Sequence, residues 1–174
     1  MNPKSSSRPK KSASALLREH NLLSAPIDVD VLASFLGAEV FYEDMEDDVS
    51  GLLLREDGAA KIAVNRDHHR NRQRFTVAHE IAHLVLHAHD KKELWVDHEY
   101  YFRSTNPRSG DQRAEVEANR FAAELLMPRE LVLEKLDSSK PLSDLDVARL
   151  AIKFGVSEQA MMWRLVHLDL IRSK

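Results

Sequence analysis

Apolar residues recur along this chain with two different spacings, and the change of spacing predicts an α+β fold. Helical spacing predicts helices at residues 14–21, 27–36, 71–88, 111–127, 130–136, 143–154 and 157–168. Short apolar runs predict three strands at 38–42, 51–55 and 61–65, with Asp57-Gly58 as a hairpin turn between the last two. Three strands alone are only marginally stable, so we expect this small sheet to pack on the 71–88 helix.

The predicted helix at 71–88 carries one polar stripe on an otherwise apolar surface. From Phe75 to His87, its polar residues fall within an arc of roughly 100°; they are Thr76, His79, Glu80, His83 and His87. The segment from His79 to His83 reads H-E-x-x-H, and histidines four residues apart lie on one helical face, where both imidazoles can bind one cation. Burying these groups without partners is costly, and a metal ion with Glu80 facing its water, as a catalytic base, removes that cost. The alternative is an amphipathic helix with an ordinary polar surface stripe.

A catalytic zinc site of this kind needs a third protein ligand, and the predicted helix at 111–127 offers one. Its charged residues Arg113, Glu117, Arg120 and Glu124 share one side at salt-bridge spacing, which indicates a solvated face. Glu115 lies on the opposite side among small and apolar residues and is the favoured ligand, with Glu117 as the alternative. If Glu115 has no role as a ligand, we expect it to form an ion pair with an Arg or Lys. Asn119, one turn further on, is placed to hydrogen-bond a ligating imidazole.

The polar segment from Lys91 to Gly110 shows no clear period and is predicted to be a loop. Three of its residues, His98, Tyr100 and Tyr101, are candidate donors to an oxyanion by their placement alone. Among the remaining histidines, His87 and His89 suit the end of the preceding helix, where a cation is favoured. His68 and His69 are assigned to the turn that enters the same helix.

The two predicted helices nearest the C-terminus resemble a helix-turn-helix pair, with Gly155 in the turn and Ser157 as an N-cap. A helix that reads DNA presents Arg, Lys, Asn or Gln in its first exposed turns. Here the helix offers Glu158, Gln159, Met161, Met162 and Trp163, with Arg164 as the only nearby base, so packing or docking of a protein partner is favoured over DNA binding.

Composition narrows the remaining choices. The net charge of −3 gives no electrostatic case for nucleic acid or an anionic membrane, and the absence of cysteine leaves only His, Asp and Glu to build a zinc site. We predict a disordered basic tail at 1–13, a core domain at 14–136 and a C-terminal helical subdomain at 137–174. No run is apolar enough to span a membrane, and no signal peptide is recognisable, so a soluble cytoplasmic protein is expected.

The segments RFTVAHEIAHLVLH and EVEANRFAAELLMP together resemble the ImmA/IrrE family of zinc peptidases, over most of the chain from about Ile27 to Leu170. The resemblance includes Ser50-Gly51 and the strand end at Asn65. It implies a minimal, thermolysin-like zincin core with His79, His83 and Glu115 as ligands and Glu80 as base. The chain has Asn119 where thermolysin-like enzymes carry Asp, so the bond to the imidazole is a neutral one.

The resemblance also implies a partner. Known members of the family cleave a helix-turn-helix repressor and thereby induce genes, so the expected function is a zinc-dependent endopeptidase acting on such a repressor or an antitoxin-like regulator. Mn²⁺ is an alternative to Zn²⁺, because the ligand set suits several metals. Two other functions stay open: a zinc-binding protein that sequesters a regulator without hydrolysis, and a DNA-binding regulator.

Overall fold

The computed structural model of the chain describes residues 12–56, 59–87, 93–98, 110–136 and 142–171. Its helices are α1 (Ala13–Glu19), α2 (Val29–Phe35), α3 (Arg70–Leu86), α4 (Gly110–Leu126), α5 (Arg129–Lys135), α6 (Asp144–Phe154) and α7 (Glu158–His167). Its strands are β1 (Ala38–Glu43), β2 (Val49–Glu56), β3 (Ala59–Asn65) and β4 (Glu93–His98). The predicted α+β class is confirmed.

The sheet is mixed and has the strand order β1-β3-β2-β4. The three predicted strands are present, with β1 parallel to β3 and β2 antiparallel to β3. The prediction of a loop from Lys91 to Gly110 is wrong for residues 93–98, which form β4 and pair antiparallel with β2 at one edge. No period in the polar segment reveals this strand, because an edge strand is held by main-chain hydrogen bonds to its neighbour.

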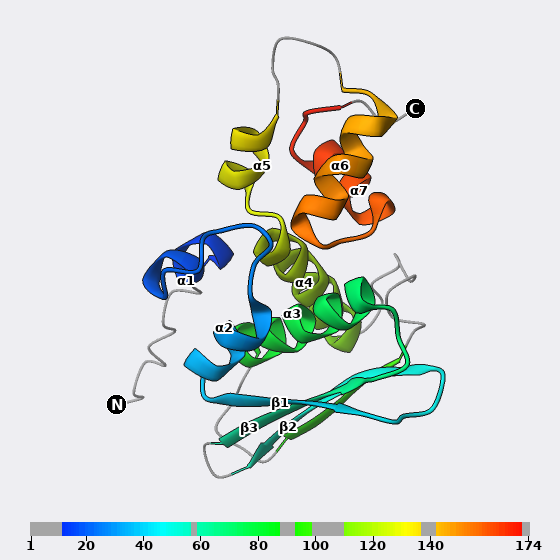
Figure 1. Cartoon of the computed structure of the whole chain (residues 1–174). Helices are drawn as coiled ribbons and strands as arrows, with labels where there is room; N and C mark the ends of the chain where they lie inside the picture. The colour runs from blue at the N-terminus through cyan, green and yellow to red at the C-terminus, as the bar shows by residue number, and fades with distance from the viewer. Residues whose placement is uncertain (1–11, 57–58, 88–92, 99–109, 137–141, 172–174) are drawn as a thin grey trace.

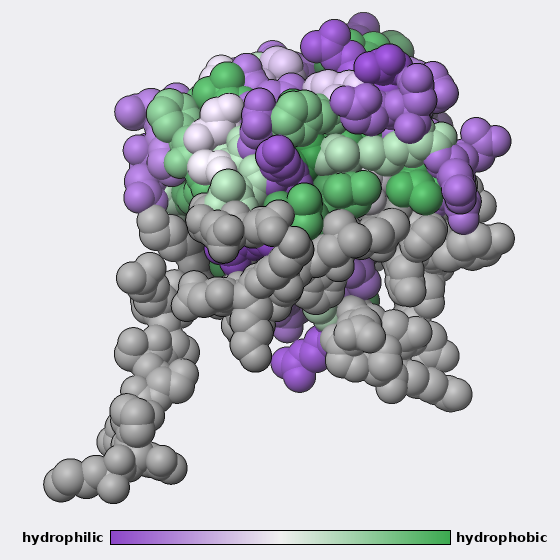
Figure 2. All heavy atoms as spheres, turned by 90° about the horizontal axis from the view of Figure 1, so that it is seen from below, coloured by the Kyte–Doolittle hydropathy of each residue, from purple (hydrophilic) through white to green (hydrophobic). Residues whose placement is uncertain are grey.

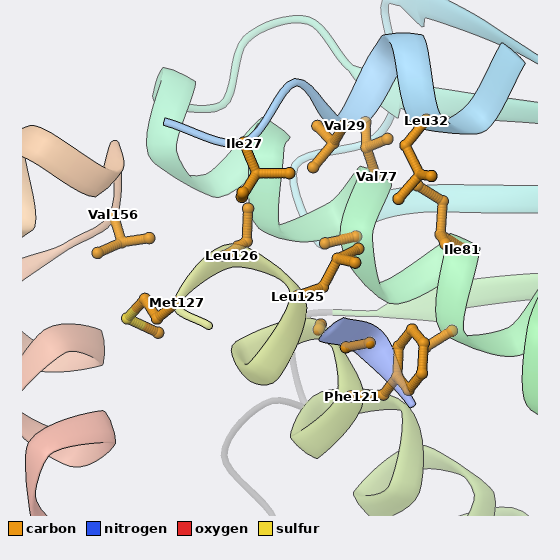
Figure 3. Close-up of a cluster of buried hydrophobic side chains, with 14 of the residues drawn as sticks. Ile27, Val29, Leu32, Val77, Ile81, Phe121, Leu125, Leu126, Met127 and Val156 are labelled. Carbon is orange, nitrogen blue, oxygen red and sulfur yellow. The ribbon is translucent and has the colours of Figure 1, made fainter. Parts of the chain in front are cut away.

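Helix α3 lies across one face of the sheet, and α4 packs against the other side of α3 (Figure 1). Apolar side chains from α2, α3 and α4 meet in a continuous buried cluster between these layers (Figure 3). Val77 and Ile81 of α3 face Leu125 and Phe121 of α4 across this cluster, and Leu32 of α2 closes it. The core therefore fixes α3 and α4, the two helices with candidate ligands, relative to each other.

The C-terminal helices α6 and α7 form a tight pair. Ser143 and Asp146 make a reciprocal capping box at the start of α6, and the Ser157 hydroxyl accepts from the Ala160 amide at the start of α7, as predicted. Gly155 ends α6 with φ of 64°, a left-handed conformation that favours glycine. The predicted turn geometry is confirmed, whereas the domain division at residue 137 stays a prediction.

The N-terminal helix begins at Ala13, one residue before its predicted start, and the Ser12 hydroxyl accepts from the Ala15 amide there. The rest of the predicted tail, residues 1–11, lies outside the described residues. Seen from below in Figure 2, hydrophobic side chains gather in the middle of the face between hydrophilic ones. Among the described helices, none combines the length and the apolar character needed to cross a bilayer.

Candidate metal centre

The first turn and a half of α3 is tied to the rest of the molecule by long donor side chains. Arg72 Nη2 donates to Ser50 Oγ on β2 at 2.6 Å, and Gln73 Nε2 donates to the carbonyl oxygens of Asn65 and Arg66 at 3.2 and 2.8 Å. Each of these acceptors lies in β2 or at the end of β3. The start of the helix is thereby fixed over the sheet.

Arg74 extends this anchoring in the opposite direction. Its guanidinium donates to the carbonyl oxygens of Gly155, Ile27 and Phe154 at 3.1, 2.9 and 3.4 Å. Burial lowers the pKa of Arg74, but a guanidinium stays charged in proteins. This one side chain therefore joins α3 to the segment before α2 and to the turn between α6 and α7.

A second arginine makes the matching connection to α4. Arg164 of α7 donates through Nε to the carbonyl oxygen of Met127, just beyond the end of α4, at 2.9 Å. Both helices of the candidate site are thus bonded to the C-terminal pair.

Helix α3 approaches the sheet most closely at Gly51 of β2. A Cβ atom there would overlap Thr76 Cγ2, would lie 2.9 Å from the Ala63 carbonyl oxygen, and would lie 3.8 Å from Glu80 Oε1. Only glycine fits this contact without a shift of backbone. The role of Gly51 is not among the sequence predictions, although a glycine inside a strand pattern is a signal of close backbone approach.

The middle of α3, from Thr76 to His83, is buried on every side. The imidazoles of His79 and His83 are 1% and 3% exposed, and Glu80 is 1% exposed. At this depth polar groups need partners, because water does not reach them.

Helix α4 has the two faces that its sequence predicts. Arg113 pairs with Glu117 at 3.4 Å and Arg120 with Glu124 at 3.3 Å along the exposed side. Ala118 and Ala122 are fully buried on the opposite side, and their small side chains allow α4 to lie close against α3. Glu115 projects from this inner side toward the two histidines.

Three side chains converge at the interface of α3 and α4. His79 Nε2 lies 3.0 Å from His83 Nε2 and 3.1 Å from Glu115 Oε2, and His83 Nε2 lies 3.3 Å from Glu115 Oε1. His79, His83 and Glu115 form a group that could hold a metal ion, with one ligand atom from each within 4.8 Å of the others. Glu117 lies outside the group, with Oε2 4.0 Å from His87 Nε2.

The tautomer of His79 follows from its second nitrogen. Nδ1 lies 3.0 Å from Asn119 Oδ1, and an amide oxygen can only accept, so Nδ1 carries the proton. Nε2 of a neutral ring then presents its lone pair to the other two members of the group. Asn119 thus makes the contact with an imidazole that its position on α4 predicts.

This donor set fits a divalent cation such as Zn²⁺. An imidazole lone pair and a carboxylate oxygen 3.1 Å apart repel each other unless a proton or a metal ion lies between them. Two imidazoles and one carboxylate are the three protein ligands of a common catalytic zinc site, which keeps its fourth position open. Among the described residues, the site therefore has the three ligands of a catalytic metal rather than the four of a closed structural one.

Glu115 keeps its negative charge in this environment. Burial raises its pKa, but when a proton rather than a metal ion lies between these groups, hydrogen bonds from His79 and His83 and their charges outweigh burial and bring the pKa to about 2. The carboxylate is therefore ionised at neutral pH and is ready to balance the charge of a cation.

The other candidate residues have separate positions. His98 is the last residue of β4, where only the backbone is described, while Tyr100, Tyr101 and His89 lie outside the described residues. His87 is the C-cap of α3, and His69 is its N-cap, where Nδ1 accepts from the Asn71 amide at 3.2 Å. The predicted places of His87 and His69 at the two ends of the helix are confirmed.

The fold and the site together define an α+β metallopeptidase: two packed helices over a mixed sheet present two imidazoles and a carboxylate to one point, beside a buried glutamate. The family model described as the IrrE N-terminal-like domain matches residues 33–166 of the chain. The chain therefore belongs to this peptidase family, the ImmA/IrrE family, as its motifs predict. No curated protein matches the chain.

Proposed function

We propose that the chain is a zinc-dependent endopeptidase with a zincin-like core, and that it cleaves a helix-turn-helix repressor or an antitoxin-like regulator in the cytoplasm to derepress genes. The observation that supports this most strongly is the meeting of His79, His83 and Glu115 beside the buried Glu80. Membership of the family supports a protein substrate. The choice of a transcriptional regulator rests on the resemblance to family members that act on one.

In this proposal His79, His83 and Glu115 hold the metal, and Asn119 keeps His79 in the tautomer whose Nε2 is free to bind it. When bound, zinc supplies Lewis acidity, which polarises a peptide carbonyl and acidifies water at neutral pH. Mn²⁺ could occupy the same ligands, since two nitrogens and a carboxylate suit several divalent metals.

Glu80 is assigned the proton transfers. It follows His79 directly on α3, and its carboxylate lies over Gly51 of β2. From this position it accepts a proton from the attacking water at one carboxylate oxygen and later gives that proton to the leaving amine. Its burial beneath α3 excludes bulk water from the transfer.

Substitution Glu80→Gln tests the proposal. The amide keeps the shape of the side chain but cannot accept the proton, so cleavage should fall by roughly 10³-fold or more while zinc content stays at one per chain. The assay is co-expression with the product of the adjacent gene, followed by mass mapping of fragments. Glu117→Gln, on the exposed face of α4, is the matched control and should cleave like the wild type.

The same experiment separates the two other functions. A chain that only sequesters its partner would bind it equally well as Glu80→Gln and would leave no fragments in either form. Direct reading of DNA is not proposed, because the exposed turns of α7 offer Glu158, Gln159, Met162 and Trp163 rather than basic residues. A salt-dependent mobility shift with purified protein would contradict that view.

A further inference from the structure

The polar stripe of α3 contains one residue to which the proposed reaction gives no role. Thr76 is fully buried, and its Oγ1 makes no hydrogen bond with any residue that the structure describes. A buried hydroxyl without a partner is unfavourable, and valine would fill the same volume without that penalty. The hydroxyl therefore calls for a partner that appears during the reaction.

The usual partner of a threonine hydroxyl within a helix is the carbonyl oxygen four residues earlier. Ser34 of α2 makes this bond, donating to the Asp30 carbonyl oxygen at 3.1 Å. Thr76 does not make the equivalent bond to Arg72. Its methyl group, Cγ2, is instead seated against Gly51 of β2, and this contact fixes the side-chain rotamer.

Glu80 lies on the same polar face, one turn further along α3. Residues four apart in a helix have neighbouring side chains. The Gly51 contact shows how close these two are, because the position of a Cβ at Gly51 lies against Thr76 Cγ2 and also 3.8 Å from Glu80 Oε1. The hydroxyl is not bonded to Glu80 in the structure, so a hydrogen bond between them requires rotation about the side-chain bonds of Glu80.

We propose that Thr76 is a positioning residue for Glu80: its hydroxyl donates a hydrogen bond to the Glu80 carboxylate and holds it in line for proton transfer. The methyl group seated at Gly51 locks the hydroxyl in place, so β2 sets the position of the base through Thr76. This inference rests on the proposed function, since it assumes that Glu80 is the base.

A structural test needs no turnover. In a crystal structure of the zinc-loaded protein, the distance from Thr76 Oγ1 to the nearer Glu80 oxygen should be about 2.5–3.0 Å. A hydroxyl that donates to the Arg72 carbonyl oxygen instead, or a carboxylate beyond hydrogen-bond reach, would overturn the proposal.

A kinetic test uses Thr76→Val and Thr76→Ser. Thr76→Val keeps the shape and the Gly51 contact, so kcat should fall about tenfold with KM and zinc content unchanged. Thr76→Ser keeps the hydroxyl and should recover most of kcat. Ser34→Ala, which removes a helical hydroxyl far from the site, should match the wild type. The probe is the best-cleaved member of a proteome-derived peptide library.

The outcomes separate this inference from the proposed function. Wild-type kcat in Thr76→Val, or an equal loss in both Thr76 variants, would reject the positioning role while leaving the peptidase intact. Cleavage by Glu80→Gln at the wild-type rate would reject the base itself, and the positioning role with it. If the library contains no cleaved peptide, the crystallographic distance still decides the matter.

Discussion

The two halves of α3 use polar groups in opposite ways. The first half, from Arg72 to Arg74, consists of donors whose hydrogen bonds end on protein acceptors, namely Ser50 Oγ and backbone carbonyl oxygens. The second half places the Nε2 atoms of His79 and His83 against a carboxylate from another helix. The first half is thus bonded largely within the protein, whereas the second half forms part of a group that could hold a metal ion.

The contrast separates the part of α3 that contributes to folding stability from the part that belongs to the candidate metal site. A buried donor matched to a carbonyl oxygen contributes about 1 kcal/mol net, but its removal leaves the acceptor unsatisfied and costs more. Facing acceptors are unfavourable until a ligand arrives, so the free energy of metal binding is partly free energy of folding. Rigid anchoring of the first half keeps the second half in a geometry that it would not hold alone.

The largest effect is expected when the candidate metal site loses the carboxylate that α4 contributes. Glu115→Gln removes the charged ligand, and zinc affinity should fall by at least about 100-fold, measured by competition with a chromophoric chelator. A zinc concentration 1,000 times the wild-type Kd raises the free energy of unfolding of the wild type by roughly 4 kcal/mol. The same concentration should stabilise the variant much less.

Glu117→Gln is the matched control for that experiment, because it changes the same residue type two positions along α4 on the solvated side. It weakens the pair with the exposed Arg113, worth about 0.2–1 kcal/mol, and a 4.0 Å contact with His87, and should leave zinc affinity unchanged. Equal losses in the two variants would contradict the assignment of Glu115 as the ligand.

A smaller effect is expected when the first half of α3, here called the anchoring half, loses Arg74. Arg74→Met removes the donors to the carbonyl oxygens of Gly155, Ile27 and Phe154, and should lower the free energy of unfolding by about 2–4 kcal/mol in urea titrations. Zinc affinity measured on the folded protein should change little. Arg120→Met, whose side chain is 81% exposed, should stay within about 0.5 kcal/mol of the wild type. Equal stability of the two variants would show that Arg74 is no anchor.

Sequence periodicity predicted the candidate metal site well, because helical geometry alone fixes which side chains share a face. It placed His79 and His83 on one face of α3 and Glu115 on the inner side of α4, and the structure brings these three together. The roles of ligand and base do not follow from proximity and remain proposals.

The anchoring half could not be predicted in the same way. Arg74 is bonded to carbonyl oxygens 47 and 81 residues away, and nothing in the local pattern indicates which backbone atoms a long side chain will reach. The parallel pairing of β1 with β3 and the addition of β4 are also long-range, since strand order is decided by packing rather than by alternation. Local spacing thus predicted helical faces, and tertiary contacts decided the rest.

The charge of Arg74 in the anchoring half also acts on the pKa of Tyr42 of β1. This residue gives the smallest predicted effect. Tyr42 Oη lies 3.0 Å from Asp30 Oδ1, and burial, the charge of Asp30 and this hydrogen bond raise its pKa to about 12, while Arg70 and Arg74 lower it. The folded state therefore holds the phenolic proton more tightly than the unfolded chain, where the pKa is 10.0. This stabilisation is fully present below pH 10 and is lost as the pH rises toward 12.

Tyr42→Phe lacks it, so the difference in unfolding free energy between wild type and variant should narrow across that window. Urea titrations at pH 8, 10 and 11 measure the difference, in which the titration of lysines cancels because both proteins share them. A difference that stays constant from pH 8 to 11 would mean that Asp30 does not hold this proton.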